Sequence, residues 1–338
     1  MKLSFCIPTY NRSEFLKKNL EILVSQIKEL SMENAIEICI SDNASTDFTQ
    51  TICENIKQTN PDINFLYQRN SSNEGPDRNF IKAMNLAHGE FSILFGDDDY
   101  LINGALKTIL EIIKHPNISI FLFNRKCIDT KGNIVSEAPF IKSSHKTKIY
   151  DYSNEDSIIS HFNSMLSLGG ALTFISSVIY KTEILKKYQF DESVIGSNYA
   201  FLFYWWNELL SGNSLYYYNS PLVLATTTGN TNNNYGKLVK RIFVDYNGFQ
   251  IIANTVFKYS PYKELFLHTV DKEHLDFELY SVYFQDKKNF ESLLLPVLKK
   301  YYWSDSKYRL FKELTNPLRI IKMFIRGFIL PSNPQPPS

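Results

Sequence analysis

The sequence contains few cysteines and no excess of charge of either sign. No two of its four cysteines form a CxxC pair, a spacing that predicts free thiols in a reducing cytoplasm rather than a disulfide framework. Lys and Arg number 36 against 35 Asp and Glu, giving a formal net charge of +1. Such a chain has no overall field to attract nucleic acid, so any function that depends on charge must be local.

Long apolar segments are also scarce. The start, MKLSFCIPTY, lacks the apolar core of a signal peptide, which predicts a cytoplasmic protein. Residues 162–180 carry no formal charge, but they contain several serines and the Gly169-Gly170 pair. They predict a loop leading into a buried strand at 174–180 rather than a membrane span. The six histidines show no metal-ligand spacing on one helix.

What the sequence does contain is a regular alternation of strand and helix patterns. Short apolar strand candidates lie at 3–7, 36–40, 63–67 and 91–95. Between the first two, an apolar stripe at spacings of three and four predicts an amphipathic helix; its members are Leu16, Leu20, Leu23, Ile27 and Leu30. This order predicts an α/β fold with parallel strands and right-handed crossovers.

Each of these four strand candidates is followed at once by a polar loop. The loops are residues 8–12, 41–47, 68–79 and 96–99. In an open α/β sheet, ligands bind outside the carboxyl ends of the strands, so the four loops are expected to converge on one crevice. The last loop holds Asp97, Asp98 and Asp99 side by side, and three adjacent carboxylates need a positive partner there.

Four motifs in these loops, FCIPTYNR, ISDNASTD, NEGPDRNF and FGDDDYL, resemble the nucleotide-sugar-binding half of a family 2 glycosyltransferase. The resemblance covers about the first 110 residues closely and the next hundred residues loosely. It implies the GT-A fold, a Rossmann-like and mostly parallel central sheet flanked by helices. It also implies transfer of a sugar, with inversion, from a nucleoside diphosphate sugar to an acceptor hydroxyl, with manganese or magnesium as cofactor. The loops 73–79 and 96–99 are most similar to the branch that builds bacterial surface polysaccharides such as O-antigen or capsule, which includes abequosyltransferase-like enzymes.

The resemblance assigns roles to the three aspartates. The metal ligand matches Asp98, with Asp99 as a second ligand and Asp97 beside the ribose. A hard divalent cation held by carboxylates can bridge them to the diphosphate and offset the charge that develops on it. Gly96 stands where many relatives have another aspartate, which leaves the division of roles open. The alternative is a solvated turn before a helix capped by Asn103.

The resemblance places further residues around the donor nucleotide. Pro8, Thr9, Tyr10 and Asn11 match the loop beneath the base and ribose, and Arg12 is expected to face the diphosphate. Asp42 matches the acceptor of the base's ring N–H, although the residues around it also suit an Asx-turn.

Arg78 matches an arginine of this family that can offer a planar fork to phosphate or base oxygens. The alternative for Arg78 is a surface salt bridge with Asp77 or Glu74.

The sequence departs from the family where the general base is expected. Relatives follow a Phe-Asp-Glu stretch, here residues 190–192, with an acidic pair about ten residues later, but residues 196–206 contain no carboxylate. The base is therefore unassigned, with Asp191 and Glu192 as weak candidates that could equally cap the next helix. Glu208, the third acid near this segment, is another alternative for the base, but it is expected on the solvated face of that helix. The aromatic residues at 199–206 suit either a sugar-stacking surface or the core.

The expected organisation is a glycosyltransferase domain at 1–230 and a helical C-terminal subdomain at 231–338. The first divides into a nucleotide-binding half, 1–110, and an acceptor half, 111–230, with a strand at 118–123 and a hairpin turn at 129–133. Residues 318–330 set Arg319, Lys322 and Arg326 among apolar residues. This pattern suits peripheral binding to the inner face of an anionic cytoplasmic membrane, near a glycan or lipid-linked glycan acceptor, or packing on the domain or on a second subunit of an oligomer.

Two further classes of function stay open. A nucleotidyltransferase uses a similar nucleotide-binding sheet, but it usually carries a glycine-rich, basic phosphate loop near the N-terminus, and PTYNRSEF is not one. A non-catalytic sugar-nucleotide-binding or scaffold protein would not need the missing acidic pair.

Overall fold

A computed structural model describes residues 1–227 and 238–315 of the chain. Its first four strands are parallel and lie where the sequence predicts them: β1 (Leu3–Thr9), β2 (Ile36–Asp42), β3 (Asn64–Arg69) and β4 (Phe91–Leu94). β1 and β2 are buried throughout, as expected for central strands covered on both faces.

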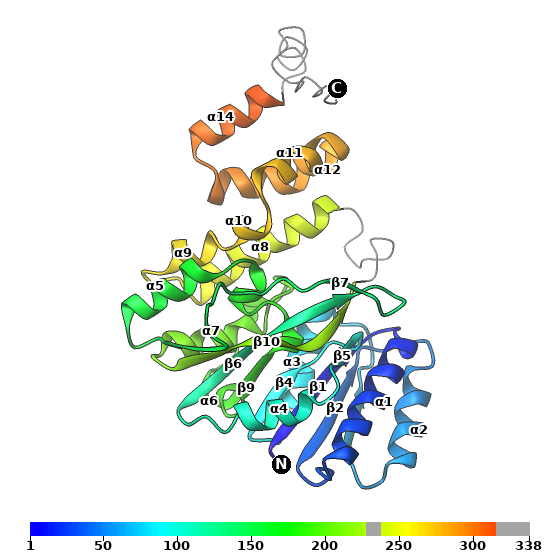
Figure 1. The fold of residues 1–338 in the computed structure, drawn as a ribbon. Helices are drawn as coiled ribbons and strands as arrows, with labels where there is room; N and C mark the ends of the chain where they lie inside the picture. The colour runs from blue at the N-terminus through cyan, green and yellow to red at the C-terminus, as the bar shows by residue number, and fades with distance from the viewer. Residues whose placement is uncertain (228–237, 316–338) are drawn as a thin grey trace, which may run out of the picture. The chain divides into compact units, whose positions relative to one another are not determined.

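The remaining strands extend this sheet with mixed directions (Figure 1). They are β5 (Asp99–Leu101), β6 (Ile118–Ile128), β7 (Ile134–Ser136), β8 (Thr147–Asp151), β9 (Val178–Lys181) and β10 (Ser214–Thr226). The sheet order is β3-β2-β1-β4-β9-β6-β10-β5, with β7 on β6 and β8 on β10. β9 runs antiparallel to both β4 and β6. The strand expected at 118–123 and the hairpin turn at 129–133 are confirmed by β6 and its antiparallel pairing with β7.

Four helices connect the strands of the first half: α1 (Ser13–Glu29), α2 (Thr49–Thr59), α3 (Pro76–Asn85) and α4 (Ala105–Ile112). α1 lies beside α2, and α3 packs on β1, β2 and β4 (Figure 1). The predicted apolar stripe of α1 enters the core, with Leu16, Leu20, Leu23 and Ile27 fully buried. Two buried polar residues of α1 also bind the sheet side. Asn19 and Gln26 donate hydrogen bonds to backbone carbonyls that follow β4 and β5.

The uncharged stretch 162–180 is not a single helix. It comprises the end of α5 (Glu155–Ser164), 3-10 turns at Leu168–Ala171 and Ile175–Ser177, and the start of β9. After β9 come α6 (Ile184–Lys187), a 3-10 turn at Glu192–Val194, and α7 (Leu202–Leu210). Every helix in the described part of the chain is too short or too polar to traverse a lipid bilayer.

The chain divides into two compact units. The first comprises Met1–Gly236 and Asn247–Glu273, and the second comprises Lys237–Tyr246 and His274–Ser338. α8 (Leu238–Thr255) contributes to both, and α9 (Lys263–Leu267) and α10 (Val270–Glu273) belong to the first. The second contains α11 (Asp276–Gln285), α12 (Lys287–Asn289), α13 (Leu295–Val297), α14 (Asp305–Leu314) and π-helical turns at Phe290–Leu294 and Leu298–Tyr302. The cationic segment 318–330 lies outside the described residues.

Candidate functional site

The polar loops after β1, β2, β3 and β4 meet at the carboxyl ends of these strands. Asn43, after β2, donates to the Oδ1 atom of Asn73 at 2.8 Å and to the carbonyl of Gly75 at 3.2 Å. Asn11, after β1, accepts from the backbone N–H of Thr46 at 2.7 Å and has a left-handed backbone with φ of 51°. The expected convergence of the loops is therefore present in the structure.

Arg12 is the positive group that faces the aspartates. Its Nη1 atom lies 2.6 Å from Oδ2 of Asp98 and 3.2 Å from Oδ1 of Asp97, while the Thr9 hydroxyl donates to Oδ2 of Asp97 at 2.8 Å. Thr9 is the last residue of β1 and Arg12 lies in the loop after it, so the carboxyl end of this strand supplies both donors. Of the two aspartates that Arg12 contacts, Asp98 is the more exposed, with 20% of its side-chain surface accessible against 7% for Asp97.

Burial makes two of the three carboxylates hard to ionise. Burial and the neighbouring charge of Asp98 raise the pKa of Asp97 to about 6, against the opposing effect of Arg12. Burial and the charge of Asp98 also raise the pKa of Asp99 to about 7, although the Ser176 hydroxyl donates to this carboxylate. Further positive charge at this loop would favour the ionised forms.

The loop that carries the aspartates is fixed from two sides. Asn19 of α1 donates to the carbonyls of Gly96 and Asp99, and the backbone N–H of Gly96 donates to the Ser176 hydroxyl at 2.8 Å. A Cβ atom at position 96 would lie 2.7 Å from a carboxylate oxygen of Asp99. Glycine at position 96 therefore leaves room for the carboxylate of Asp99. α4 is preceded by Gly104 rather than capped by Asn103, and Asp99 begins strand β5, so these acids do not form a simple solvated turn.

Asp42 lies at the end of β2 and is fully buried. Its Oδ1 accepts from the backbone N–H of Ser45 at 2.8 Å, the expected Asx-type turn, and its Oδ2 accepts from the Tyr67 hydroxyl at 2.6 Å. Arg69 adds a charge 3.6 Å from Oδ2. Each oxygen keeps a further lone pair, but the side chain is fully buried, so contact with a nucleotide base would require a covering group to move. The residues matched to the loop beneath the base and ribose differ in their exposure. Pro8 and Thr9 are buried in β1, whereas 43% of Tyr10 is exposed.

Arg78 and Glu192 form an ion pair, with Nη2 of Arg78 2.8 Å from Oε2 of Glu192. Neither partner expected for Arg78 contacts it, because Glu74 pairs with Lys82 and Asp77 binds backbone amides elsewhere. Asp191 accepts from the backbone N–H of Ser193, which is the expected capping of the 3-10 turn at Glu192–Val194.

The segment without carboxylates is largely a core segment. All six aromatic side chains expected either in the core or on a sugar are at most 8% exposed; they are Tyr199, Phe201, Phe203, Tyr204, Trp205 and Trp206. The expectation that Glu208 lies on a solvated helix face is wrong. Glu208 is buried and accepts from Lys187 Nζ at 2.8 Å and from the Tyr188 hydroxyl at 2.9 Å. Lys187 supplies the charge that makes this burial possible.

Sequence reasoning missed Asp77 as a buried group. Its carboxylate accepts hydrogen bonds from the backbone N–H groups of Gly196, Asn198 and Ala200. Sequence reasoning considered Asp77 only as a partner for Arg78. The available signal was Gly196-Ser197-Asn198, far from Asp77 in the sequence, since glycine and asparagine accept the left-handed backbone that forms a nest of N–H groups.

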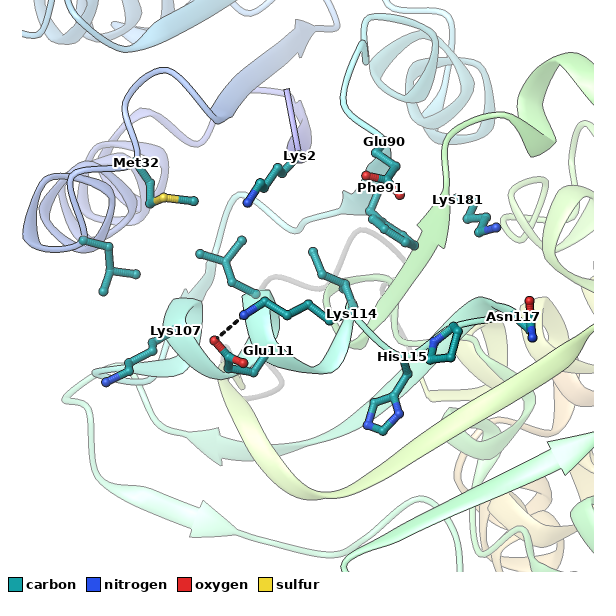
Figure 2. A pocket seen from close by; sticks show the side chains of 14 residues that line it. Lys2, Met32, Glu90, Phe91, Lys107, Glu111, Lys114, His115, Asn117 and Lys181 are labelled. Atoms are coloured by element: carbon teal, nitrogen blue, oxygen red, sulfur yellow. Dashed lines mark hydrogen bonds and ion pairs between the residues drawn. The ribbon is translucent and has the colours of Figure 1, made fainter.

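A cavity of about 660 Å³ lies at the opposite ends of the strands from the aspartates. Lys2, just before β1, and Glu90, just before β4, line it, so it adjoins the amino ends of these strands. Figure 2 shows its side chains, among them Lys107 of α4 and the ion pair of Lys114 with Glu111. The aspartates follow the opposite ends of the strands and do not line this cavity.

Comparison with solved structures defines the class of fold. The structure of Staphylococcus aureus TarS 1–349 in complex with UDP-GlcNAc matches with a TM-score of 0.62 over 88% of this chain and 81% of that one, at 19% identity. The mannosyltransferase PcManGT from Pyrobaculum calidifontis, in complex with GDP-Man and Mn²⁺, matches with a TM-score of 0.56 over 97% of this chain and 84% of that one, at 13% identity. The fold is therefore GT-A-like, as the sequence predicts, with a mostly parallel mixed sheet and a helical C-terminal part.

The sequence comparisons define the family. Residues 4–173 match Glycosyl transferase family 2, and the chain belongs to this family. It is 37% identical over 209 residues to the abequosyltransferase RfbV of Salmonella typhimurium, covering 60% of each chain. It is 27% identical over 197 residues to GalNAc(5)-diNAcBac-PP-undecaprenol beta-1,3-glucosyltransferase of Campylobacter jejuni, covering 58% of this chain and 57% of that one. The matched region thus spans little more than half of each of these relatives.

Proposed function

We propose that this protein is an inverting glycosyltransferase that moves a sugar from a nucleoside diphosphate sugar to an acceptor hydroxyl in bacterial surface-polysaccharide synthesis. The observation that carries the proposal is the cluster of Asp97, Asp98 and Arg12 where the four loops meet. Both signs of charge are present there, which suits a ligand made of an anionic diphosphate and a cation. Membership of the family and similarity to RfbV support the reaction and the biological setting.

We propose a divalent cation, manganese or magnesium, as cofactor. No group of three or more His, Cys, Asp or Glu in residues 1–227 and 238–315 is arranged to enclose a metal. A complete protein cage is not needed, however, because such ions are commonly held by one or two carboxylates together with substrate phosphates. Asp98 is the proposed ligand because it is accessible, and Asp99 is the second. When bound, the cation would offset the negative charge that develops on the departing diphosphate.

The residues of this chain would then act mainly by binding and orientation. Arg12 shares Asp98 with the proposed cation, so a bound cation would release its guanidinium from this carboxylate to turn to the diphosphate. Asn11 fixes the loop after β1 on the loop after β2 through Thr46, and Tyr10 offers an exposed ring to the base. Asp42 and Asp97 are proposed to recognise the base and the ribose.

For the general base, Glu192 is the better of the two candidates. The Asp191 carboxylate caps the 3-10 turn, whereas 65% of the Glu192 side chain is exposed. Arg78, its ion-pair partner, lies in the first turn of α3, directly after the loop that follows β3, so Glu192 is tied to the donor side of the site.

We propose a lipid-linked glycan as the acceptor and peripheral association with the cytoplasmic face of the membrane. The acceptor named for the Campylobacter jejuni relative, a PP-undecaprenol glycan, supports the first proposal. The cationic and apolar sequence of residues 318–330 supports the second.

The test is to incubate the protein with Mn²⁺ and a panel of UDP-, GDP-, CDP- and TDP-sugars and to measure slow release of nucleoside diphosphate. We expect release from at least one sugar nucleotide, its loss in the presence of a chelator, and its loss in Asp98→Asn. Binding without release would indicate a non-catalytic binding protein. Release of pyrophosphate from nucleoside triphosphate and sugar phosphate would indicate a nucleotidyltransferase.

A further inference from the structure

The first turn of α3 carries three consecutive side chains that reach three separate parts of the first unit. Asp77 binds the segment before α7, Arg78 pairs with Glu192, and Asn79 binds the ends of β1 and β2. Asp77 and Asn79 are at most 4% exposed. One helical turn therefore contacts both the strand ends of the donor side and the segment where relatives carry their acidic pair.

The contact of Asp77 is specific to an ionised carboxylate. Its Oδ2 accepts from the N–H groups of Gly196 at 2.8 Å and Asn198 at 3.0 Å, and its Oδ1 accepts from the N–H of Ala200 at 3.1 Å. Gly196 and Asn198 have left-handed backbones, with φ of 95° and 62°. This backbone turns the N–H groups of every second residue, 196, 198 and 200, to one side and forms a nest around the carboxylate. Burial raises the pKa of Asp77, and the three N–H groups oppose that rise.

Asn79 makes the contact to the donor side. Its Nδ2 donates to the carbonyl of Ser41 at 3.1 Å and to that of Thr9 at 3.4 Å, and its Oδ1 accepts from the Ser41 hydroxyl at 2.7 Å. Thr9 in turn donates to Asp97. A short chain of hydrogen bonds thus joins Asp97, through Thr9, to the first turn of α3.

The segment Gly196–Ala200 contains no acidic side chain of its own and lies immediately before α7. Phe201, the next residue, packs edge-on against Phe80 of α3 with ring centroids 5.7 Å apart. The backbone of this segment is thus organised from α3 by one polar and one aromatic contact.

We propose that Asp77 is a positioning residue that couples donor binding to the order of Gly196–Ala200, the acceptor-side segment. Occupation of the nucleotide site stiffens the ends of β1 and β2, and α3 transmits this restraint through Asn79 and Asp77. The proposal rests on the proposed function for the identity of the ligand.

The test is hydrogen–deuterium exchange of the full chain with and without Mn²⁺ and each of UDP, GDP, CDP and TDP. In the wild-type protein, a nucleotide that binds is expected to slow exchange both at residues 8–12 and at Gly196–Ala200. Asp77→Asn replaces one acceptor oxygen by an N–H₂ group that faces backbone donors. It is expected to speed exchange at Gly196–Ala200 roughly tenfold and to abolish the effect of nucleotide there.

Asp77→Asn should leave nucleotide affinity within about twofold of wild type, which distinguishes loss of coupling from loss of the donor site. Glu74→Gln, which removes the ion pair between the loop before α3 and Lys82 of α3, is the matched control and should keep the effect. If Asp77→Asn does not fold, Gly196→Ala serves instead, because it strains the segment without a steric clash and leaves α3 unchanged.

Each result has a definite meaning. Nucleotide protection of Gly196–Ala200 that persists in Asp77→Asn, or in Gly196→Ala when that variant is used, overturns the coupling. Protection at residues 8–12 without protection at Gly196–Ala200 in the wild type overturns it too, while leaving the proposed function intact. Protection at neither segment with any of the four nucleotides counts against the proposed function and removes the basis of the coupling.

Discussion

Arg12 and Asp98 form the closer of the two ion pairs that join the loop after β1 to the loop after β4, with 2.6 Å between Nη1 and Oδ2. The same nitrogen lies 3.2 Å from Asp97, so a single guanidinium offsets two neighbouring carboxylates. A divalent cation can offset the charge of neighbouring carboxylates in the same way, and it occupies a smaller volume than a guanidinium. Arg12 and a bound cation should therefore compete for Asp98, the carboxylate that both contact, and removal of one should increase the effect of the other.

Arg12→Ala tests this competition. Without the guanidinium, the two carboxylates lose their charged hydrogen-bond donor, which should cost roughly 1.5–3 kcal/mol of stability in the presence of a chelator. Addition of Mn²⁺ should restore more stability to this variant than to the wild type. Thermal melts with chelator and with Mn²⁺ measure both effects, and Lys114→Ala, which removes an exposed pair with Glu111, is the control. Equal Mn²⁺ shifts in Arg12→Ala and the wild type would contradict the competition.

The parallel half of the fold could be predicted because its signals are local. Apolar runs such as 36–40 and the stripe of α1 determine which faces are buried, and the loops follow the strands in the same topological position. The positive partner of Asp97 and Asp98 was harder to predict. Arg12 was expected to face a diphosphate, and only the packed structure places its guanidinium between the two carboxylates.

Asp42 and Tyr67 give a second prediction. Because Asp42 is fully buried and accepts from Ser45 and Tyr67, Asp42→Ala should lower stability by roughly 1.5–3 kcal/mol in addition to weakening nucleotide binding. The sequence alone predicts the loss of binding with an intact fold.

Tyr67→Phe separates the two effects, since it removes only the hydroxyl that occupies Oδ2 of Asp42. Urea unfolding measures stability and titration calorimetry with UDP, GDP, CDP and TDP in Mn²⁺ measures binding. We expect Tyr67→Phe to keep or strengthen nucleotide binding. Weaker binding of every nucleotide by Tyr67→Phe would mean that the hydroxyl itself contributes to the site.

The acceptor side could not be predicted from sequence spacing. The resemblance predicts a carboxylate within 196–206, and the carboxylate that reaches this segment comes instead from Asp77, far away in the sequence. The sequence predicts Glu208 on the solvent face of α7 because a lone acidic residue on a helix usually lies there. Lys187 and Tyr188 pair with it inside the protein, and pairing at that sequence distance leaves no local pattern.

His274 gives a prediction of pH dependence for the second unit. Burial lowers its pKa, but hydrogen bonds and charge from Asp245 and Glu278 outweigh burial and raise it above the ordinary value. Arg241, which also faces Asp245, is the nearby positive group. A raised folded pKa means that the protonated His274 stabilises the folded state fully below an unfolded pKa of about 6.5, and that this stabilisation is lost as the pH rises through the folded value.

His274→Gln should therefore destabilise the protein more at about pH 6 than at about pH 9. Urea unfolding of the full chain at the two pH values measures the difference. His268→Gln, at a histidine that is half exposed and paired with Asp271, is the matched control and should show little effect. A loss of stability for His274→Gln that is the same at both pH values would contradict a protonated His274 in the folded protein.

The last prediction concerns residues 318–330, which lie outside the described part of the chain. Their sequence carries Arg319, Lys322 and Arg326 among apolar side chains. Each such charge near an anionic bilayer contributes about 1 kcal/mol, which together with a partly inserted apolar face gives reversible binding that weakens with salt. We expect the full chain to co-sediment with anionic liposomes but not with neutral ones, and a chain that ends at Asn316 to stay in the supernatant.

Replacement of the three basic residues by Gln is the matched control for charge, and it should reduce binding to anionic liposomes by at least about tenfold. Equal sedimentation of the full and shortened chains would show that the tail does not bind the membrane, and the acceptor would then have to bring the protein there.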